Sequence, residues 1–357
     1  RVEGRLFEDA KKLRQWQDLG HEVVLLFGTF TGMIGDPSDK SATRVKLTRE
    51  QIDRNVSDYA NQASKILDLS ENAKNPIQIQ YNHEWLSPIN FEGVVDLASN
   101  FTIQQMLERS MFKNRIQNNQ PVYLHEVLYP LMQGFDSVAM DVDIEVGGKD
   151  QIFNMLVGRD LMKIYKQKEK WVLPTKLIED PSGKKMGKTE GNIVSITDLP
   201  EVKYEAIMTW PDTAIPLGLE LITSVPMESV NQIQQLLETG KVNPVELKEA
   251  FAYRVVSELD GHDNAIFAQE EFNRVKRLGE LPSRMPESSV IKGSKLSAVL
   301  VSSGLVKTQE EAFSLVRGGA IHVDGAQVKK DIAWNLSKGV LTIGKKTIKN
   351  ARVIHAE

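Results

Sequence analysis

The first regular pattern along the chain is helical, and a strand-like pattern follows it directly. Within residues 8–19, which Gly20 follows, apolar groups recur every three or four positions, at Ala10, Leu13, Trp16 and Leu19. This spacing predicts an amphipathic helix that ends at a glycine. Residues 22–27 are mostly apolar without alternation, which predicts a buried β-strand. A helix that leads into such a strand is typical of a parallel α/β sheet.

Helical and strand patterns continue to alternate after this strand. We expect a helix over residues 48–69, which Thr48 would begin, and then an alternating strand over residues 77–80. The later elements are, in order, a connection at 82–88, helical segments at 91–111 and 124–135, a strand at 142–146, a helix at 152–164 and a strand at 171–178. This alternation predicts an α/β domain.

The pattern changes after Trp210. Charged helices are expected over residues 227–278, with turns near residues 240–244 and 261–262, and residues 281–289 have the composition of a linker. Two short helices at 296–303 and 310–316 and strands near 320–323 and 340–343 then predict a compact module. In this module, Asp324 and Gly325 predict a hairpin turn.

Composition limits the class of protein. A chain of 357 residues exceeds the ~250–300 at which one core stops growing, so two or three domains are expected. With 41% apolar and 26% charged residues, and no apolar run near the ~18 residues that span a bilayer, we expect a soluble protein without a membrane role. The absence of cysteine excludes disulfides and fits the cytoplasm. The six histidines show no metal-ligand spacing, so no metal site is predicted.

Charge is distributed unevenly along the chain. From Lys292 to the end there are eleven lysine and arginine residues against five acidic ones, a balance of +6. Since the whole chain carries −4, the preceding residues carry −10. A solvated surface would explain the lysines, but their concentration in one small module favours contact with RNA phosphates.

Glycine-rich loops follow two of the predicted strands, at residues 28–40 and 147–151. Open α/β sheets bind their ligands at the carboxyl ends of strands, although many tight turns have similar sequences. A third loop, residues 180–192, carries Lys184, Lys185 and Lys188 among glycines. Lysines on such a loop suit a polyphosphate such as a nucleoside triphosphate, and a solvated turn is the alternative.

Three polar residues lie at helical spacing in the segment 124–135 and just beyond it. Tyr129, Gln133 and Asp136 are separated by four and three positions, so they share one face of a helix or lie just past its end. Their neighbours are apolar, so this face would border a core. Buried polar groups need partners, and a ligand can be one of them.

These motifs together resemble those of the tyrosyl-tRNA synthetases, in the same order and with similar spacing. Residues 31–40 fit the family's TGxIGDPSxK loop, and the polar trio fits its helix motif, which holds the amino acid. Residues 147–151 resemble the GGxDQ element, which contacts the ribose and the substrate carboxylate. Residues 185–189 resemble the KMSKS signature of class I synthetases. Glu145 departs from the family, since bacterial members often carry glutamine there.

The resemblance implies roles for individual residues. The catalytic lysines would be Lys40, Lys185 and Lys188, and ATP would be bound by Gly148, Asp150, Lys185, Met186, Gly187, Lys188 and Thr189. Tyrosine would be bound by Thr31, Asp36, Tyr129, Gln133, Asp136 and Gln151. In the basic module, residues 317–325 resemble part of a small RNA-binding fold shared with a ribosomal protein, and tRNA would be bound by Lys295, Arg317, His322, Lys329 and Lys330.

The resemblance also implies an architecture and a reaction. We expect a Rossmann-like parallel-sheet catalytic domain at 1–217, an α-helical domain at 218–280, a linker at 281–291 and a small α+β RNA-binding module at 292–357. The implied enzyme is a tyrosine–tRNA ligase that forms tyrosyl-adenylate from tyrosine and ATP and transfers the tyrosyl group to tRNA(Tyr). Mg²⁺ would accompany ATP, without an intrinsic metal or organic cofactor, and the family implies a homodimer.

One family signature is missing. The HIGH motif, and the strand before it, should precede the first helix, but residues 3–6 do not contain it. Because the chain begins at Arg1, we favour an absent N-terminal segment. Two alternatives remain. A tryptophanyl-tRNA synthetase has a similar fold, although the basic module and Asp136 favour tyrosine; an inactive synthetase-like RNA-binding protein would explain the missing motif.

Overall fold

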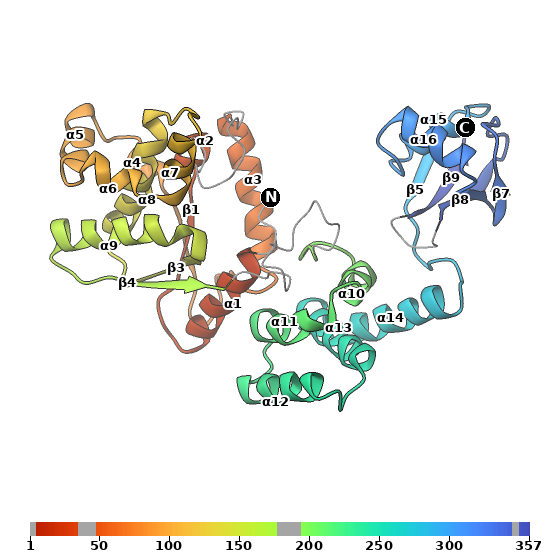
Figure 1. Cartoon of the computed structure of the whole chain (residues 1–357), viewed down its shortest axis with the longest axis horizontal. Helices are drawn as coiled ribbons and strands as arrows, with labels where there is room; N and C mark the ends of the chain where they lie inside the picture. Colours follow the sequence, from red (N-terminus) through yellow and green to blue (C-terminus); the bar gives the residue numbers. More distant parts are fainter. Residues whose placement is uncertain (1–4, 35–47, 177–193, 345–349) are drawn as a thin grey trace. The chain divides into compact units, whose positions relative to one another are not determined.

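The computed structural model describes residues 5–34, 48–176, 194–344 and 350–357 (Figure 1). The chain divides into two compact units. The first comprises Arg1–Thr197 and Thr213–Thr239, and the second comprises Asp198–Asp212 and Gly240–Glu357. Within the described ranges, every helix is too short or too polar to cross a lipid bilayer.

The first unit is a mixed α/β structure with parallel strands, as the sequence predicts. Helix α1 (Arg5–Asp18) ends before Gly20, whose φ is +89°, and leads to strand β1 (Val24–Phe27). β1 pairs in parallel with β2 (Gln78–Tyr81). The predicted strand is confirmed, but the central residues of β1 are only half-buried.

The second parallel pair joins β3 (Ile144–Gly148) to β4 (Trp171–Thr175). Among the described residues these strands form a separate two-stranded sheet, so the parallel strands occur as two pairs. The 3₁₀ turn η1 (Lys149–Gln151) connects β3 directly to α9 (Ile152–Lys166). The carboxyl end of β3 therefore meets the start of a helix, as the glycine loop predicts.

Helices surround these strands, and their ends follow local capping chemistry. Thr48 caps α3 (Arg49–Ala63) in a capping box with Gln51, although the helix stops before the predicted residue 69. The expected connection at 82–88 contains the single helical turn α4 (His83–Leu86). The remaining helices of this unit are α2 (Thr31–Ile34), α5 (Phe91–Ser99), α6 (Ile103–Leu107), α7 (Ser110–Gln117), α8 (Leu124–Met140), α11 (Ile215–Ile222) and α12 (Met227–Glu238).

One core of this unit includes the contact between α8 and α9, which run side by side (Figure 1). A Cβ atom at Gly134 of α8 would lie 2.9 Å from the side chains of Val157 and Leu161 and 3.1 Å from the backbone nitrogen of Gly158. The two helices can therefore approach closely only because residue 134 has no side chain. This contact continues α8 to Met140, beyond the predicted end at residue 135.

The helices of the second unit are α10 (Pro200–Met208), α13 (Pro244–Asp260), α14 (His262–Phe272) and the π-helix η4 (Asn273–Arg277), and the 3₁₀ turn η3 (Asp212–Ala214) lies between the two units in sequence. Helices are thus found over the predicted stretch 227–278, although its first helix, α12, belongs to the first unit. Gly240 and Gly261 have positive φ, which confirms the two predicted turns. Inside α10, the buried Lys203 donates to both carboxylate oxygens of Asp260 at 2.9 and 2.7 Å.

The C-terminal module is a five-stranded sheet in the order β5-β9-β8-β6-β7. Its strands are β5 (Glu287–Val290), β6 (Ile321–Val323), β7 (Ala326–Val328), β8 (Lys338–Ile343) and β9 (Ala351–Ala356), and its helices are α15 (Leu296–Ser302) and α16 (Gln309–Arg317). Asp324 and Gly325 form the predicted β6–β7 turn, both with positive φ. Residues 287–290 lie inside the predicted linker 281–291, yet they form β5, because β9 pairs with them.

Candidate active site

The candidate site lies in the first unit, where several elements end close together. Thr31 begins α2 just after β1, and Asn82 directly follows β2. Asp136 and Gln133 lie on α8, and Gln151 ends the turn after β3. Parallel strands bring their carboxyl ends to one edge of a sheet, which explains why residues from distant parts of the sequence meet here.

Asp136 lies at the centre of a buried hydrogen-bond network. Its side chain is only 4% exposed, and its Oδ1 accepts a hydrogen bond from Trp85 Nε1 at 2.7 Å. Asn82 Nδ2 donates to Asp136 Oδ2 at 3.2 Å and to Thr31 Oγ1 at 3.1 Å. Asn82 Oδ1 accepts from the backbone nitrogen of Phe30 at 2.8 Å. Asn82 therefore ties the loop after β1 to the carboxylate on α8.

Burial raises the pKa of Asp136 from its ordinary value of 3.8 to about 7. The hydrogen bonds from Trp85 and Asn82 favour the carboxylate and lower this pKa, while the negative charge of Glu145 raises it and Lys170 lowers it. Near neutral pH, Asp136 can therefore either accept a proton or donate one to a hydroxyl partner.

Gln133 and Gln151, both predicted to bind tyrosine, are linked through Asn154. Asn154 is completely buried, and its Nδ2 donates to Gln133 Oε1 at 2.8 Å and to Gln151 Oε1 at 3.1 Å. Its own Oδ1 is buried and finds no hydrogen-bond partner among the residues that the structure describes. Gln133 Nε2 donates to Glu145 Oε1 at 3.3 Å. The structure thus brings together residues from α8, β3, η1 and α9.

The predicted ATP residues that the structure describes lie beside this network. Gly148 is buried at the end of β3, and Asp150 is half-buried in η1. Gln151 Nε2 lies 3.5 Å from Asp150 Oδ2. Tyr129 is half-buried on α8, one helical turn before Gln133. The polar trio thus lies entirely within the helix.

The other predicted catalytic and nucleotide residues are not described. Asp36 and Lys40 fall in residues 35–47, outside the described residues. The lysine loop falls in residues 177–193, which also lie outside the described residues. This range contains Lys185, Met186, Gly187, Lys188 and Thr189. Their roles stay predictions from the sequence.

The predicted tRNA residues are spread over the C-terminal module. Lys295 precedes α15 and Arg317 ends α16; both side chains are exposed. His322 is half-buried in β6, and Lys329 and Lys330 are exposed after β7. Lys295 lies close to the segment after β7, because its Nζ donates to the carbonyl oxygen of residue 331 at 3.4 Å.

Sequence reasoning missed five residues of the buried network: Asn82, Trp85, Ser137, Asn154 and Lys170. Asn82 lies two residues after the predicted strand 77–80, so its place near a strand's carboxyl end was a usable signal. Lys170 precedes a predicted strand, where a lysine side chain is expected to be exposed to solvent. Its side chain is nevertheless fully buried. Nothing in the local sequence distinguishes it from an exposed lysine.

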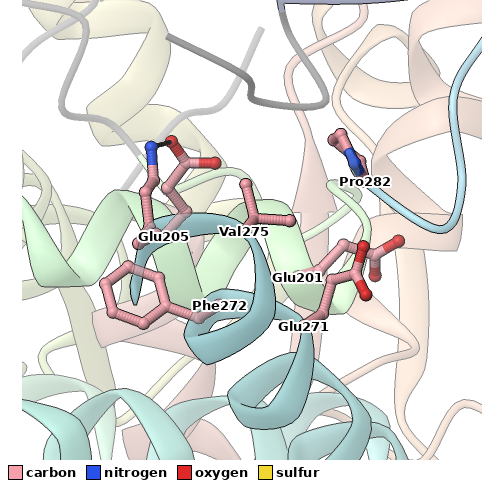
Figure 2. A pocket seen from close by; sticks show the side chains of 7 residues that line it. Glu201, Glu205, Glu271, Phe272, Val275 and Pro282 are labelled. Atoms are coloured by element: carbon pink, nitrogen blue, oxygen red, sulfur yellow. Dashed lines mark ion pairs between the residues drawn. The ribbon is translucent and has the colours of Figure 1, made fainter. Parts of the chain in front are cut away.

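A small pocket in the second unit encloses about 20 Å³, room for about one water molecule. Figure 2 shows its lining, in which Lys276 forms an ion pair with Glu205 at 2.7 Å. The carboxylate oxygens of Glu201 are buried there without a hydrogen-bond partner in the described part of the chain, and one water molecule would satisfy them. The pocket is too small for an amino acid or a nucleotide. Across the described ranges, no group of three or more acidic or histidine side chains is arranged to hold a metal ion.

Comparison with known proteins gives consistent relatives. A family model described as "tRNA synthetases class I (W and Y)" matches residues 7–276. The tyrosine–tRNA ligase of Carboxydothermus hydrogenoformans is 41% identical over 325 residues, 89% of this chain and 78% of that protein. The tyrosine–tRNA ligase of Thermotoga maritima is 38% identical over 340 residues, 94% of this chain and 83% of that protein.

Solved structures share the fold at lower identity. A C-terminally truncated mitochondrial tyrosyl-tRNA synthetase of Aspergillus nidulans has a TM-score of 0.59 and 20% identity, covering 76% of this chain and 82% of that one. The tyrosyl-tRNA synthetase of Archaeoglobus fulgidus, solved with L-tyrosine, has a TM-score of 0.56 and 20% identity, covering 75% of this chain and 87% of that one.

Proposed function

The chain belongs to the class I tRNA synthetases, among the tyrosyl-tRNA synthetases, and we propose that its candidate site activates tyrosine with ATP and transfers it to tRNA(Tyr). The observation that carries the choice of amino acid is the buried carboxylate of Asp136, held by two hydrogen-bond donors inside the first unit. Tryptophan could donate only an indole N–H to this carboxylate, as Trp85 already does, and not a hydroxyl group. The relatives of about 40% identity, which are tyrosine–tRNA ligases, support the same substrate.

In this proposal the phenolic hydroxyl of tyrosine donates a hydrogen bond to Asp136. Asn82 and Trp85 hold the carboxylate in place before the substrate arrives, so little reorganisation is needed on binding. Phenylalanine would leave the buried carboxylate without this partner. A site built for a hydroxyl rejects the analogue that lacks it by ~10⁴–10⁵, which makes an editing site unnecessary.

The other end of tyrosine would lie toward Gln133 and Gln151. Tyr129, Gln133 and Asp36 would accept hydrogen bonds from the substrate ammonium group. Thr31, which belongs to the same loop of the sequence as Asp36, would also contact tyrosine. Gln151 would contact the substrate carboxylate, while Gly148 and Asp150 would contact the ribose of ATP. The link through Asn154 supports this arrangement, because it brings the two glutamine side chains close together.

The first step would be an in-line displacement. The tyrosine carboxylate attacks the α-phosphorus of ATP, a new C–O–P linkage forms, and the bond to pyrophosphate breaks. Lys185, Lys188 and Lys40 would neutralise the departing pyrophosphate, so their effect would be on the transition state. Mg²⁺ would accompany ATP, bound chiefly by its phosphates. A hydroxyl at the tRNA 3′ end then attacks the tyrosyl carbonyl and AMP leaves.

The C-terminal module would supply contacts to tRNA. Its +6 balance and the exposed Lys295, Arg317, Lys329 and Lys330 suit phosphate contacts, and His322 lies in the neighbouring strand. The absence of cysteine in the sequence and the role in translation support a cytoplasmic protein.

We also infer that the chain forms a homodimer through helices α5–α8. Large apolar side chains are exposed on all four of these helices, at Phe91, Val95, Ile103, Ile116 and Leu124. Residues of α5, α6 and α8 also contribute to one buried core. Large exposed apolar surface is uncommon on monomers and favours an interface.

The direct test is amino-acid-dependent exchange of pyrophosphate into ATP, measured with tyrosine, phenylalanine and tryptophan. Tyrosine should stimulate exchange far more than either alternative. Exchange stimulated best by tryptophan would overturn the substrate assignment. tRNA binding without exchange by any amino acid, including with an extended N-terminus, would favour an inactive RNA-binding protein.

A further inference from the structure

Lys170 has an unusual place beside the candidate site. It directly precedes β4, yet its side chain is 0% exposed. Its ammonium group forms an ion pair with Glu145 and donates hydrogen bonds to Ser137 Oγ at 2.7 Å and to the backbone oxygen of Met155 at 3.2 Å. Three acceptors match the three donors of a lysine ammonium group, so the charge is fully coordinated.

Glu145 connects this lysine to the predicted substrate site. Its Oε2 accepts from Lys170 and from Ser137 Oγ, the latter at 3.2 Å, and its Oε1 accepts from Gln133 Nε2 at 3.3 Å. The negative charge of Glu145 is therefore neutralised by a buried lysine.

The neighbouring helix leaves room for this arrangement. A Cβ atom at Gly158 of α9 would lie 2.6 Å from Lys170 Nζ and 2.7 Å from Ser137 Oγ. Both distances are below any contact that a real Cβ atom makes, so a side chain there would displace the lysine. The glycine at residue 158 therefore leaves the space that the ammonium group of Lys170 needs.

The chemistry of a carboxylate determines how Gln133 must be oriented. An ionised carboxylate can only accept hydrogen bonds, so Gln133 has to present its NH₂ group to Glu145. Its carbonyl oxygen then faces the opposite way, where Asn154 Nδ2 donates to it at 2.8 Å. A carbonyl oxygen has a second lone pair, which remains for a ligand donor such as an ammonium group.

We propose that Lys170 and Glu145 are positioning residues that fix the Gln133 amide with its oxygen toward the ammonium group of the amino acid. This inference rests on the proposed function, since it assigns the ammonium group to Gln133. Lys170 pairs with the Glu145 side chain and fixes its rotamer. A glutamine at position 145 beside Lys170 would turn its oxygen to the lysine and its NH₂ to Gln133, which would force the Gln133 amide to reverse.

The test compares ligands with and without an ammonium group. Equilibrium binding to the full chain is measured for tyrosine, for tyramine and for 3-(4-hydroxyphenyl)propionate, the last of which lacks the ammonium group. Glu145→Gln should weaken the binding of tyrosine and of tyramine by about ten- to a hundred-fold, which is the contribution of one hydrogen bond to a charged group. Binding of the propionate should stay within about twofold, because it makes no such bond.

Removing the lysine as well should restore binding. In the Glu145→Gln, Lys170→Met double variant, the Ser137 hydroxyl remains next to the amide at position 145, and because a hydroxyl can donate or accept, the amide can again turn its oxygen to Gln133. The affinities for tyrosine and tyramine should then return to within about fivefold of the parent values. Such a recovery would show strong coupling between residues 145 and 170. Equal losses for all three ligands, or no recovery in the double variant, would overturn the proposal.

A matched control separates positioning from folding. Lys203 and Asp260 form another buried ion pair, in the second unit. Asp260→Asn should lower the melting temperature, as Glu145→Gln should, but leave the affinities of all three ligands unchanged. If Asp260→Asn reproduces the selective loss, the positioning role is refuted. A parent protein that binds tyrosine no better than phenylalanine would contradict the proposed function itself, which is a different result.

Discussion

The indole Nε1 of Trp85 donates a hydrogen bond to Asp136 Oδ1 at 2.7 Å, joining the helical turn after β2 to the middle of the polar face of α8. Asn82 holds the other oxygen of the same carboxylate. The side chain that would read the substrate hydroxyl is therefore fixed by residues about fifty positions earlier in the sequence. Its orientation and its protonation both depend on these contacts.

Replacing Asp136 should change the choice of amino acid. Asp136→Ala removes the group that would pair with the phenolic hydroxyl, so tyrosine activation should fall and most of the ~10⁴–10⁵ discrimination against phenylalanine should disappear. The measurement is pyrophosphate exchange with both amino acids. Asp143→Ala is the control, because that aspartate is largely exposed. Retained selectivity in the Asp136 variant would refute the role assigned to it.

Removing only the indole donor should have a smaller effect in the same direction. Trp85→Phe keeps an aromatic ring but deletes the hydrogen bond to Asp136, which should weaken tyrosine binding by about tenfold. Trp171→Phe is a matched control, since Trp171 is 71% exposed. Binding titrations of the two variants test the difference. Equal affinities would show that Trp85 does not act through the carboxylate.

The pKa of Asp136 predicts how stability depends on pH. Because its pKa is about 7 in the folded chain and near 3.8 when unfolded, the folded state binds the extra proton between these values. Stability from this group is therefore greatest below pH 3.8, falls as pH rises, and levels off above about 7. Relative to the parent, Asp136→Asn should gain melting temperature progressively over that window. A constant difference across the window would show that the pKa is not raised.

The lysine loop should act on the rate of activation. Lys185→Ala and Lys188→Ala should each lower the rate of adenylate formation, while tyrosine affinity stays nearly unchanged, because the pyrophosphate charge develops as it leaves. Lys184→Ala is the control, since it lies outside the matched motif. Single-turnover kinetics with tyrosine titration separate the two quantities. A large loss of tyrosine affinity at an unchanged rate would contradict the assignment of these lysines to the departing pyrophosphate.

The C-terminal module should carry salt-dependent tRNA binding. A chain that ends after Met285 lacks β5 together with the rest of its sheet. It keeps the hydrogen bond from Ser283 to Glu271 and the cation–π contact of Arg284 with the ring of Phe267. Pyrophosphate exchange should persist, whereas tRNA binding should weaken and depend less steeply on salt, because fewer counterions are released. Unchanged tRNA affinity would mean that the +6 charge is a solvated surface.

Local chemistry made much of the architecture predictable from the sequence. Apolar spacing gave α1, Thr48 and Gln51 marked the start of α3, and Asp324 with Gly325 marked a hairpin. These signals are local, because a cap, a turn or a helical face depends on residues a few positions apart. The family resemblance likewise came from short motifs that remain intact in the chain.

The sequence alone could not show which distant residues share a contact. Strand β5 has the composition of a linker and becomes a strand only because β9 pairs with it. Lys170 looks like a solvated lysine, and only the packing of α8 against α9, with no side chain at Gly158, places it against Glu145. Burial and pairing depend on the whole fold, so the partners of Asp136 and Gln133 were decided by tertiary structure, while the presence of these two residues on one helical face was fixed by their spacing.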